Sequence, residues 1–420
     1  MKTLRSASKL NLFPRNIQSR LNMFVLFLAF PAFSVLGNSI TFLIFLDLIY
    51  RVGKSKVNFR GHHLFFAFFT VGLISSIFTP VIDRHPGIVS VIIILIQFLY
   101  WIGIASFTIK NYSRIDLMQL SKWMMTGSLI YIFVFFIVPF NFNSGLLSIE
   151  FKPGRNALVF NLLCTIPLSF YYIHKRWNRK GVLIFSFFFF VTMLFTNGRA
   201  GSIILLIQIF FIFSIVFIKI RKYFRFILIC SIPIIILFQS DKGMELVEKI
   251  SYEVSKINQP LGMLILSSKT GSLERDKSWS SRKLFISKGK EIFFERPFIG
   301  IGPNNFKYYD SNLNLYSKFD YLQGNTKEFY NRRSAHNSYM QILVEFGLIG
   351  FIFYIIILFR PIFLLRRNLL KATLKIEHLP IISLLGVAIH FYAISAFTGA
   401  IPWLIIGLCW AQTTKLVRKK

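Results

Sequence analysis

The sequence predicts an all-α integral membrane protein, with about twelve membrane-spanning helices and one large loop between the ninth and tenth. Of its 420 residues, 54% are hydrophobic and 50 are phenylalanine. Only 16% are charged, whereas soluble domains contain roughly 25%. The charged residues form short clusters between apolar runs, and several of these runs approach the roughly 20 apolar residues that a spanning helix needs. This pattern is typical of a multi-pass membrane protein.

The net charge of +32 does not indicate a nucleic-acid-binding protein. The basic residues lie between hydrophobic segments, where a positive-inside bias places them in the cytoplasm. The short basic links are 51–60, 110–122, 174–180, 219–222 and 360–375, and both termini (1–20 and 415–420) are basic as well. All of them fall on one side of the membrane if the chain has twelve helices, and this agreement is the main support for that number.

The apolar runs divide the chain into three parts. We expect an N-terminal bundle of about nine helices at 1–239, a loop at 240–337 and a C-terminal part at 338–420 with a basic cytoplasmic tail. The expected helices are two short ones within 21–50, then 62–82, 87–107, 122–141, 156–173, 181–196, 202–219 and 224–239, and after the loop 339–359, 380–396 and 399–413. The long loop, Arg199 and His336 then share the non-cytoplasmic face. ATP and nucleotide sugars do not reach that face, so a group donor must arrive there already activated, most simply on a lipid.

The loop is mixed in charge and contains one amphipathic helix, expected at about 280–294 and ended by Pro297. A turn-rich stretch follows at 300–306. Its Gly-x-Gly pair is a weak phosphate-binding signal because no Lys-Ser ending of a Walker motif follows. A structural turn is the favoured interpretation.

His336 is the strongest candidate for chemistry, because it lies with Asn337 at the mouth of a membrane helix. The N-terminus of a helix presents unpaired N–H groups and a partial positive charge. That field favours a neutral imidazole, which can act as a general base, and it attracts an anion such as pyrophosphate. An interfacial or helix-capping role is the alternative that the residues alone leave open.

Two arginines accompany this histidine on the same expected face. Arg199 lies in a tight Gly-flanked turn, and Arg282 lies on the amphipathic loop helix. Each alone suits a solvated or snorkelling side chain. Together with His336 they also suit a lipid-linked diphosphate, since guanidinium groups bind phosphate oxygens bidentately.

Other residues with reactive side chains receive structural interpretations. His390 lies inside an apolar run, where ionisable groups are costly and often functional, yet a hydrogen-bonded core histidine is favoured; Glu345 is treated with the same caution. Cys164, Cys230 and Cys409 lie in or beside apolar runs without metal-ligand spacing, which indicates buried packing rather than a disulfide framework.

Three motifs, taken in order, resemble the O-antigen ligase and O-antigen polymerase superfamily of bacterial envelope glycosyltransferases. Residues 197–201 (NGRAG) look like the family's Ser-Arg-Gly/Ala turn, with Asn-Gly in place of the usual serine. Residues 281–285 (SRKLF) and 296–306 (RPFIGIGPNNF) are similar to the opening of its large periplasmic loop. Residues 336–350 reproduce the ligase-type signature His-Asn-x9-Gly-x-x-Gly.

The resemblance implies a multi-pass protein of the bacterial inner membrane, with its active site on the periplasmic side. Such enzymes transfer a glycan from undecaprenyl diphosphate to an acceptor hydroxyl, without a metal or other cofactor. His336 would then deprotonate the acceptor, while Arg199 and Arg282 would bind the leaving diphosphate. Substrate-binding roles are expected for four further residues, namely Asn337, Arg332, Arg333 and Asn304.

The acceptor is left open between several choices. A ligase would transfer the glycan to lipid A-core, and the signature after His336 favours this reading. A repeat-unit polymerase would transfer it to another lipid-linked glycan, and a protein O-oligosaccharyltransferase to a protein. A flippase for the same lipid-linked sugars is the competing non-enzyme, but inverted repeats and mid-membrane charges, which it would predict, are not evident in the sequence.

Overall fold

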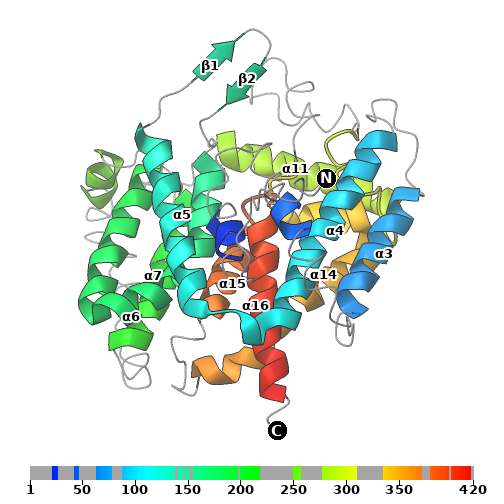
Figure 1. Cartoon of the computed structure of the whole chain (residues 1–420). Helices are drawn as coiled ribbons and strands as arrows, with labels where there is room; N and C mark the ends of the chain where they lie inside the picture. Colours follow the sequence, from blue (N-terminus) through cyan, green and yellow to red (C-terminus); the bar gives the residue numbers. More distant parts are fainter. Residues whose placement is uncertain are drawn as a thin grey trace, which may run out of the picture.

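The described part of the chain is predominantly α-helical and forms a bundle with one helix lying across its end (Figure 1). The structure is a computed structural model. It describes residues 21–26, 42–46, 63–77, 88–137, 141–144, 147–150, 155–196, 199–217, 249–256, 277–309, 334–370, 379–396 and 399–417. The helical class predicted from the sequence is therefore confirmed for these residues.

The first long helices are α3 (His63–Ile77), α4 (Ile88–Asn111) and α5 (Leu117–Ile137). A single 3-10 turn joins α4 to α5, and Asp116 caps the start of α5. Its Oδ1 accepts hydrogen bonds from the backbone N–H groups of Met118 (2.8 Å) and Gln119 (3.4 Å). These bonds pair two of the N–H groups that a helix start leaves without helical partners.

A two-stranded antiparallel hairpin follows α5, with β1 at Asn141–Ser144 and β2 at Leu147–Glu150. The sequence predicts no strand between the helices expected at 122–141 and 156–173, so the all-α prediction missed this hairpin. The hairpin and α11 (Lys277–Glu295) lie at one end of the bundle, and the C-terminal end of α16 (Ala400–Val417) lies at the other (Figure 1).

The segment α6 (Arg155–Phe195) is a pair of helices joined at Asn178, whose φ of 53° and ψ of −149° are not helical. The two helices correspond to the separate ones expected at 156–173 and 181–196. The next helix, α7 (Arg199–Phe217), packs against α6 and α15 (Leu379–His390). Gln208 joins these three elements, because its Nε2 donates to the carbonyls of Leu163 (3.0 Å) and Ile382 (3.1 Å).

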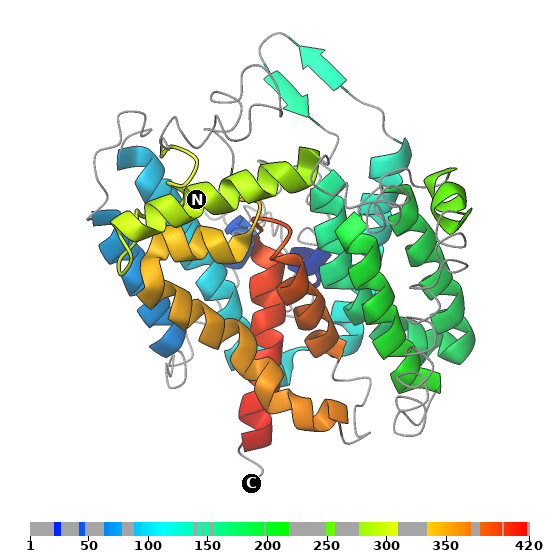
Figure 2. The ribbon, with the colours of Figure 1, turned by 180° about the vertical axis from the view of Figure 1, so that it is seen from behind.

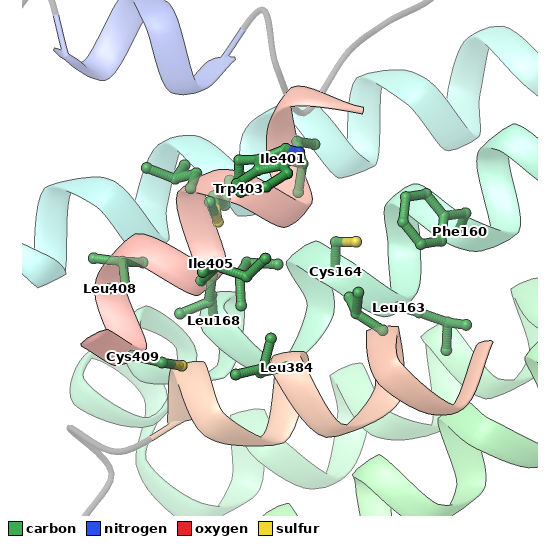
Figure 3. Packing of buried hydrophobic residues seen from close by; sticks show 14 of the residues in the cluster. Phe160, Leu163, Cys164, Leu168, Leu384, Ile401, Trp403, Ile405, Leu408 and Cys409 are labelled. Atoms are coloured by element: carbon green, nitrogen blue, oxygen red, sulfur yellow. The ribbon is translucent and has the colours of Figure 1, made fainter. Parts of the chain in front are cut away.

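The main core takes buried side chains from α3, α4, α5, α6, α7, α14 (Ser338–Leu370), α15 and α16. Figure 3 shows the part of it that lies between α6, α15 and α16. Figure 3 shows side chains of all three helices meeting there, including Leu163, Leu384 and Trp403. Cys164 and Cys409 are buried in this core as free thiols, which confirms the packing role predicted for them. Cys230 lies outside the described residues.

The longest C-terminal helix, α14 (Ser338–Leu370), runs beneath α11 and then turns down along the bundle (Figure 2). It leaves helical geometry at Gly347 and continues through Pro361. The expected end near residue 359 is therefore wrong, because the helix continues into the basic link 360–375 as far as Leu370. The expected helix at 380–396 is also too long, since α15 ends at His390 and residues 391–396 form turns and extended backbone.

Two helical segments of the described chain are long and apolar enough to cross a membrane, namely Asn156–Met193 and Ser338–Leu365. The outward side chains of α6 and α14 are also apolar, for example Ile184, Phe187 and Ile352. Contiguous exposed apolar surface of this kind suits contact with lipid. The number of twelve spans, the helix expected at 224–239 and the three-part division of the chain remain predictions, and residues 224–239 lie outside the described ranges.

Replacing Gly386 by alanine is expected to destabilise the protein by about 1–3 kcal/mol, as overpacking of a tight core does. The added Cβ would overlap the Nε2 of Gln208. In a Gln208→Ala background the same change should cost at least about 1 kcal/mol less, since neighbouring residues couple. The unfolding temperatures of the four variants in detergent measure this coupling.

Ser383→Ala on the same helix is the matched control. Its buried hydroxyl makes no hydrogen bond in the described part of the chain, so its removal breaks no bond and should not lower the unfolding temperature. If Gly386→Ala lowers the unfolding temperature equally in the wild-type and Gln208→Ala backgrounds, the close contact between Gly386 and Gln208 is contradicted.

Candidate active site

The candidate site lies where the start of α14 meets α11 and the turn that follows α15. Asn337 caps α14, since its Oδ1 accepts a hydrogen bond of 3.0 Å from the backbone N–H of Met340. This arrangement is the usual one for an N-cap asparagine. Substrate binding by Asn337 remains a prediction, and its side-chain oxygen already serves the helix.

The turn 391–396 fixes the start of α14 through Ser338. The backbone N–H of Ser338 donates to the carbonyls of Phe391 (2.8 Å) and Ile394 (3.0 Å). Its hydroxyl donates to the carbonyl of Ile394 (2.6 Å) and accepts from the backbone N–H of Ala396 (3.0 Å). The helix start is thus held by protein groups on this side.

His336 precedes this cap in a left-handed backbone conformation, with a φ of 49°. Such a conformation is uncommon for a residue other than glycine and often accompanies functional sites. The half-buried imidazole lies with its centroid 5.4 Å from the ring of the buried Phe285 on α11. Contact with α11 therefore orients the imidazole.

Arg282 lies one helical turn before Phe285 on α11, so both side chains project from the same face of that helix. Its Nη2 donates to the carbonyl of Ala393 at 3.5 Å. Ala393 belongs to the turn that binds Ser338, which follows His336 by two residues. The structure therefore brings the predicted residues Arg282 and His336 to one place.

Arg199 is the first residue of α7, and only its backbone is described. Two residues later, Gly201 packs so closely on Val159 of α6 that a Cβ there would overlap it. The next residue, Phe160, stacks on His390 at 5.9 Å between ring centroids. The start of α7 is thus at the same end of the bundle as the turn that binds Arg282.

Segment 297–302, which follows α11, is bonded to α14 at its break. The N–H groups of Ile301 and Gly302 donate to the carbonyls of Val344 (3.1 Å) and Glu345 (2.9 Å). In return, the N–H groups of Leu348 and Ile349 donate to the carbonyls of Pro297 (2.7 Å) and Phe298 (3.4 Å). The Gly-x-Gly stretch is therefore a structural turn, because these N–H groups bind α14.

Glu345 is fully buried beside this break. Its Oε1 accepts hydrogen bonds from Gln341 Nε2 (2.9 Å) and from the backbone N–H of Phe306 (3.3 Å). The backbone of Asn304 also binds this carboxyl group, and Ser75 of α3 donates to the Glu345 carbonyl (2.7 Å). Asn304 therefore lies where the segment that follows α11 meets α14. Its contact with substrate remains a prediction.

A second small core lies beneath α11 and contains Phe285, Ile301, Phe306, Ala335 and Val344. It unites α11, the segment after it, the residue before His336 and α14 in one apolar contact. Arg332 and Arg333 lie outside the described residues, so their predicted roles stay predictions.

His390 is buried and stacks on Phe160 of the main core, which confirms the predicted core position. It ends α15, is 5% exposed and lies within electrostatic range of Arg282. The signal in the sequence was an ionisable side chain within an apolar run. What the sequence lacked was the neighbour, which is distant along the chain.

The fold and the site define a helical, membrane-type protein with a His/Arg centre at one end of its bundle. Residues 184–355 match the family model described as O-antigen ligase. The match contains all three motifs noted above and confirms the predicted resemblance to the O-antigen ligase and polymerase superfamily. No curated protein matches the chain significantly.

Gly347→Ala is expected to destabilise α14 and its joint by about 1–3 kcal/mol or more, the cost of holding a residue in a sparsely populated conformation. Gly347 has a φ of 65°, and a Cβ there would overlap the carbonyl of Phe298. The unfolding temperature in detergent measures the loss. Gly399→Ala is the matched control, because a Cβ at Gly399 would make only ordinary contacts, the nearest at 3.4 Å; an equal effect of the two changes would contradict the joint.

Asn337→Ala should cost about 1 kcal/mol, as the loss of an N-cap does. Asn337→Asp should restore the stability, since a carboxylate oxygen also caps and suits the positive end of the helix. The unfolding temperatures of both variants test this, with Asp116→Ala at the start of α5 as a cap of known geometry. If Asn337→Asp unfolds at the same lowered temperature as Asn337→Ala, Asn337 does not stabilise the protein as an N-cap.

Proposed function

We propose that the protein is an O-antigen ligase-like glycosyltransferase of the bacterial inner membrane. It transfers a glycan from undecaprenyl diphosphate to a hydroxyl of lipid A-core at the periplasmic face, with no metal or other cofactor. The family match supports the superfamily, and the His-Asn-x9-Gly-x-x-Gly signature supports the ligase. The donor, the acceptor and the face of the membrane belong to the proposal.

The observation that carries the proposal is the meeting of Arg282 and the His336 end of α14 at one turn. Arg282 binds the carbonyl of Ala393, and Ser338 binds the carbonyls of Phe391 and Ile394. A cation and a nearby imidazole supply the two functions that transfer from a diphosphate needs: charge neutralisation and proton removal.

In the proposed reaction, His336 accepts the proton of the acceptor hydroxyl as the oxygen attacks the anomeric carbon from the side opposite the diphosphate. The bond between that carbon and the phosphate oxygen breaks, and its electron pair leaves with undecaprenyl diphosphate. A glycosidic bond of inverted configuration forms. The strained backbone and the Phe285 contact hold the imidazole where this proton is released.

Arg282 and Arg199 are assigned to the diphosphate. Guanidinium groups form paired hydrogen bonds with phosphate oxygens and keep their charge at any physiological pH. The leaving group gains negative charge in the transition state, so these contacts strengthen as the bond breaks. Arg332 and Arg333 are proposed to assist on the loop side, and Asn304 and Asn337 to contact substrate.

A repeat-unit polymerase of the same superfamily is the second candidate, favoured by the shared motifs. It would use the same donor chemistry and a second lipid-linked glycan as acceptor. A protein O-oligosaccharyltransferase and a flippase follow as further alternatives, and the experiment below separates them by where the glycan accumulates.

His336→Ala is expected to insert and fold normally and to lower transfer by at least about 100-fold, the usual contribution of a general base. The variant is expressed in a deletion strain, and envelope lipopolysaccharide and undecaprenyl-linked glycan are analysed together. The ligase predicts long chains on the lipid carrier and bare core on the gel. His174→Ala is the matched control, because His174 lies near the Asn178 turn of α6, far from Phe160.

Single repeat units on core would instead identify the polymerase. Wild-type glycan assembly with His336→Ala would contradict the catalytic role of this residue. An unchanged envelope in the deletion strain itself would contradict glycan transfer altogether.

A further inference from the structure

His390 and Ser395 lie three residues before and two residues after Ala393, whose carbonyl Arg282 binds, and each has a buried polar atom. The Nδ1 atom of His390 and the Oγ atom of Ser395 are buried, and neither has a hydrogen-bond partner in the described part of the chain. Leaving such an atom unpaired costs about 1–3 kcal/mol. Unlike Ser383, whose Oγ is also unpaired in that part of the chain, these two residues lie close in sequence to Ala393, whose carbonyl Arg282 binds. Their place beside this contact favours a ligand that pairs both atoms.

The surroundings of His390 favour a neutral, partly apolar ligand. Its ring stacks on Phe160, with centroids 5.9 Å apart and planes inclined by 19°. Phe160 in turn stacks on Phe391 at 5.8 Å. Small-molecule sites typically combine aromatic walls with a few placed polar groups.

The chemistry of the two atoms indicates hydroxyl groups as their partners. A serine hydroxyl both donates and accepts a hydrogen bond, and an imidazole nitrogen does one or the other. A sugar presents several hydroxyl groups and an apolar C–H face, which match the polar pair and the aromatic rings. A phosphate would be recognised by the neighbouring cation instead.

We propose that His390 and Ser395 form the subsite that binds the first sugar of the donor, the one joined directly to the diphosphate. The inference rests on the proposed function, in which Arg282 binds that diphosphate. Arg282 lies within electrostatic range of His390 and bonds to Ala393, between the two subsite residues. A sugar attached to a diphosphate at Arg282 therefore falls beside them.

The test compares two ligands and three variants of the purified full-length protein in lipid nanodiscs. The ligands are undecaprenyl diphosphate without sugar and the glycan-bearing lipid extracted from the deletion strain. His390→Phe keeps a ring that can stack on Phe160 but removes the nitrogen. His390→Asn places an amide near the position of Nδ1, and Ser395→Ala removes the hydroxyl.

We expect His390→Phe to weaken binding of the glycan-bearing lipid about tenfold, which corresponds to one hydrogen bond of about 1.4 kcal/mol. Binding of bare undecaprenyl diphosphate should stay unchanged. His390→Asn should restore most of the loss, and Ser395→Ala should weaken glycan-bearing lipid in the same selective way. Ser383→Ala, two turns earlier on α15, is the control and should bind both ligands as the wild type does.

If His390→Phe binds each ligand as tightly as the wild type does, the subsite is overturned and His390 is a packing residue. Weaker binding of both ligands would assign His390 to the diphosphate, and a raised acceptor KM alone would assign it to the acceptor; either result overturns the donor-sugar assignment. If His390→Phe fails to fold, the Asn and Ser395→Ala variants decide by the same criteria. A separate measurement tests the proposed function. If the wild-type protein transfers no glycan from the extracted donor lipid, that function is wrong.

Discussion

At Gly347 the backbone of α14 leaves helical geometry, and the rest of the site depends on how this break is satisfied. The break separates two carbonyls, at 344 and 345, from the N–H groups of 348 and 349 that would otherwise bind them. All four groups bond instead to the segment 297–302. In a membrane each unpaired backbone group costs several kcal/mol, so the break and the segment that follows α11 require one another. The pairing ties segment 297–302 to α14 at a fixed point.

The turn 391–396 forms a second joint, which fixes α11 relative to the start of α14. The turn 391–396 binds the start of α14 through Ser338 and binds α11 through Arg282. Together with the small core under Phe285, the two joints hold α11 across the end of α14 (Figure 2). A side chain on α11 and another before α14 then meet, although more than fifty residues separate them. Rigid placement of this kind is what positioned catalysis requires.

Sequence reasoning could predict the helical class and the pairing of Arg282 with His336, because apolar runs and ordered motifs carry that information. It missed the passage of α14 through Pro361, since basic residues and proline usually mark helix ends. It predicted that His390 is buried but could not predict that its ring stacks on Phe160, because only tertiary packing defines that neighbour. The hairpin after α5 has a Ser-Gly turn signal at 144–145, but its strands of 4 residues each are too short to give a clear alternating pattern.

The signature His-Asn-x9-Gly-x-x-Gly acquires a geometric meaning from these contacts. Asn337 caps the helix and Gly347 breaks it, so the nine residues between them fix the distance and rotation from His336 to the joint with segment 297–302. Each helical residue adds about 1.5 Å and about 100°. One inserted residue would therefore turn the joint by more than a quarter of the circle relative to His336. Arg282 lies on α11, and segment 297–302 directly follows that helix. After such an insertion α11 would be rotated away, and Arg282 would no longer lie near the imidazole. The spacing of the motif therefore determines whether the two residues meet.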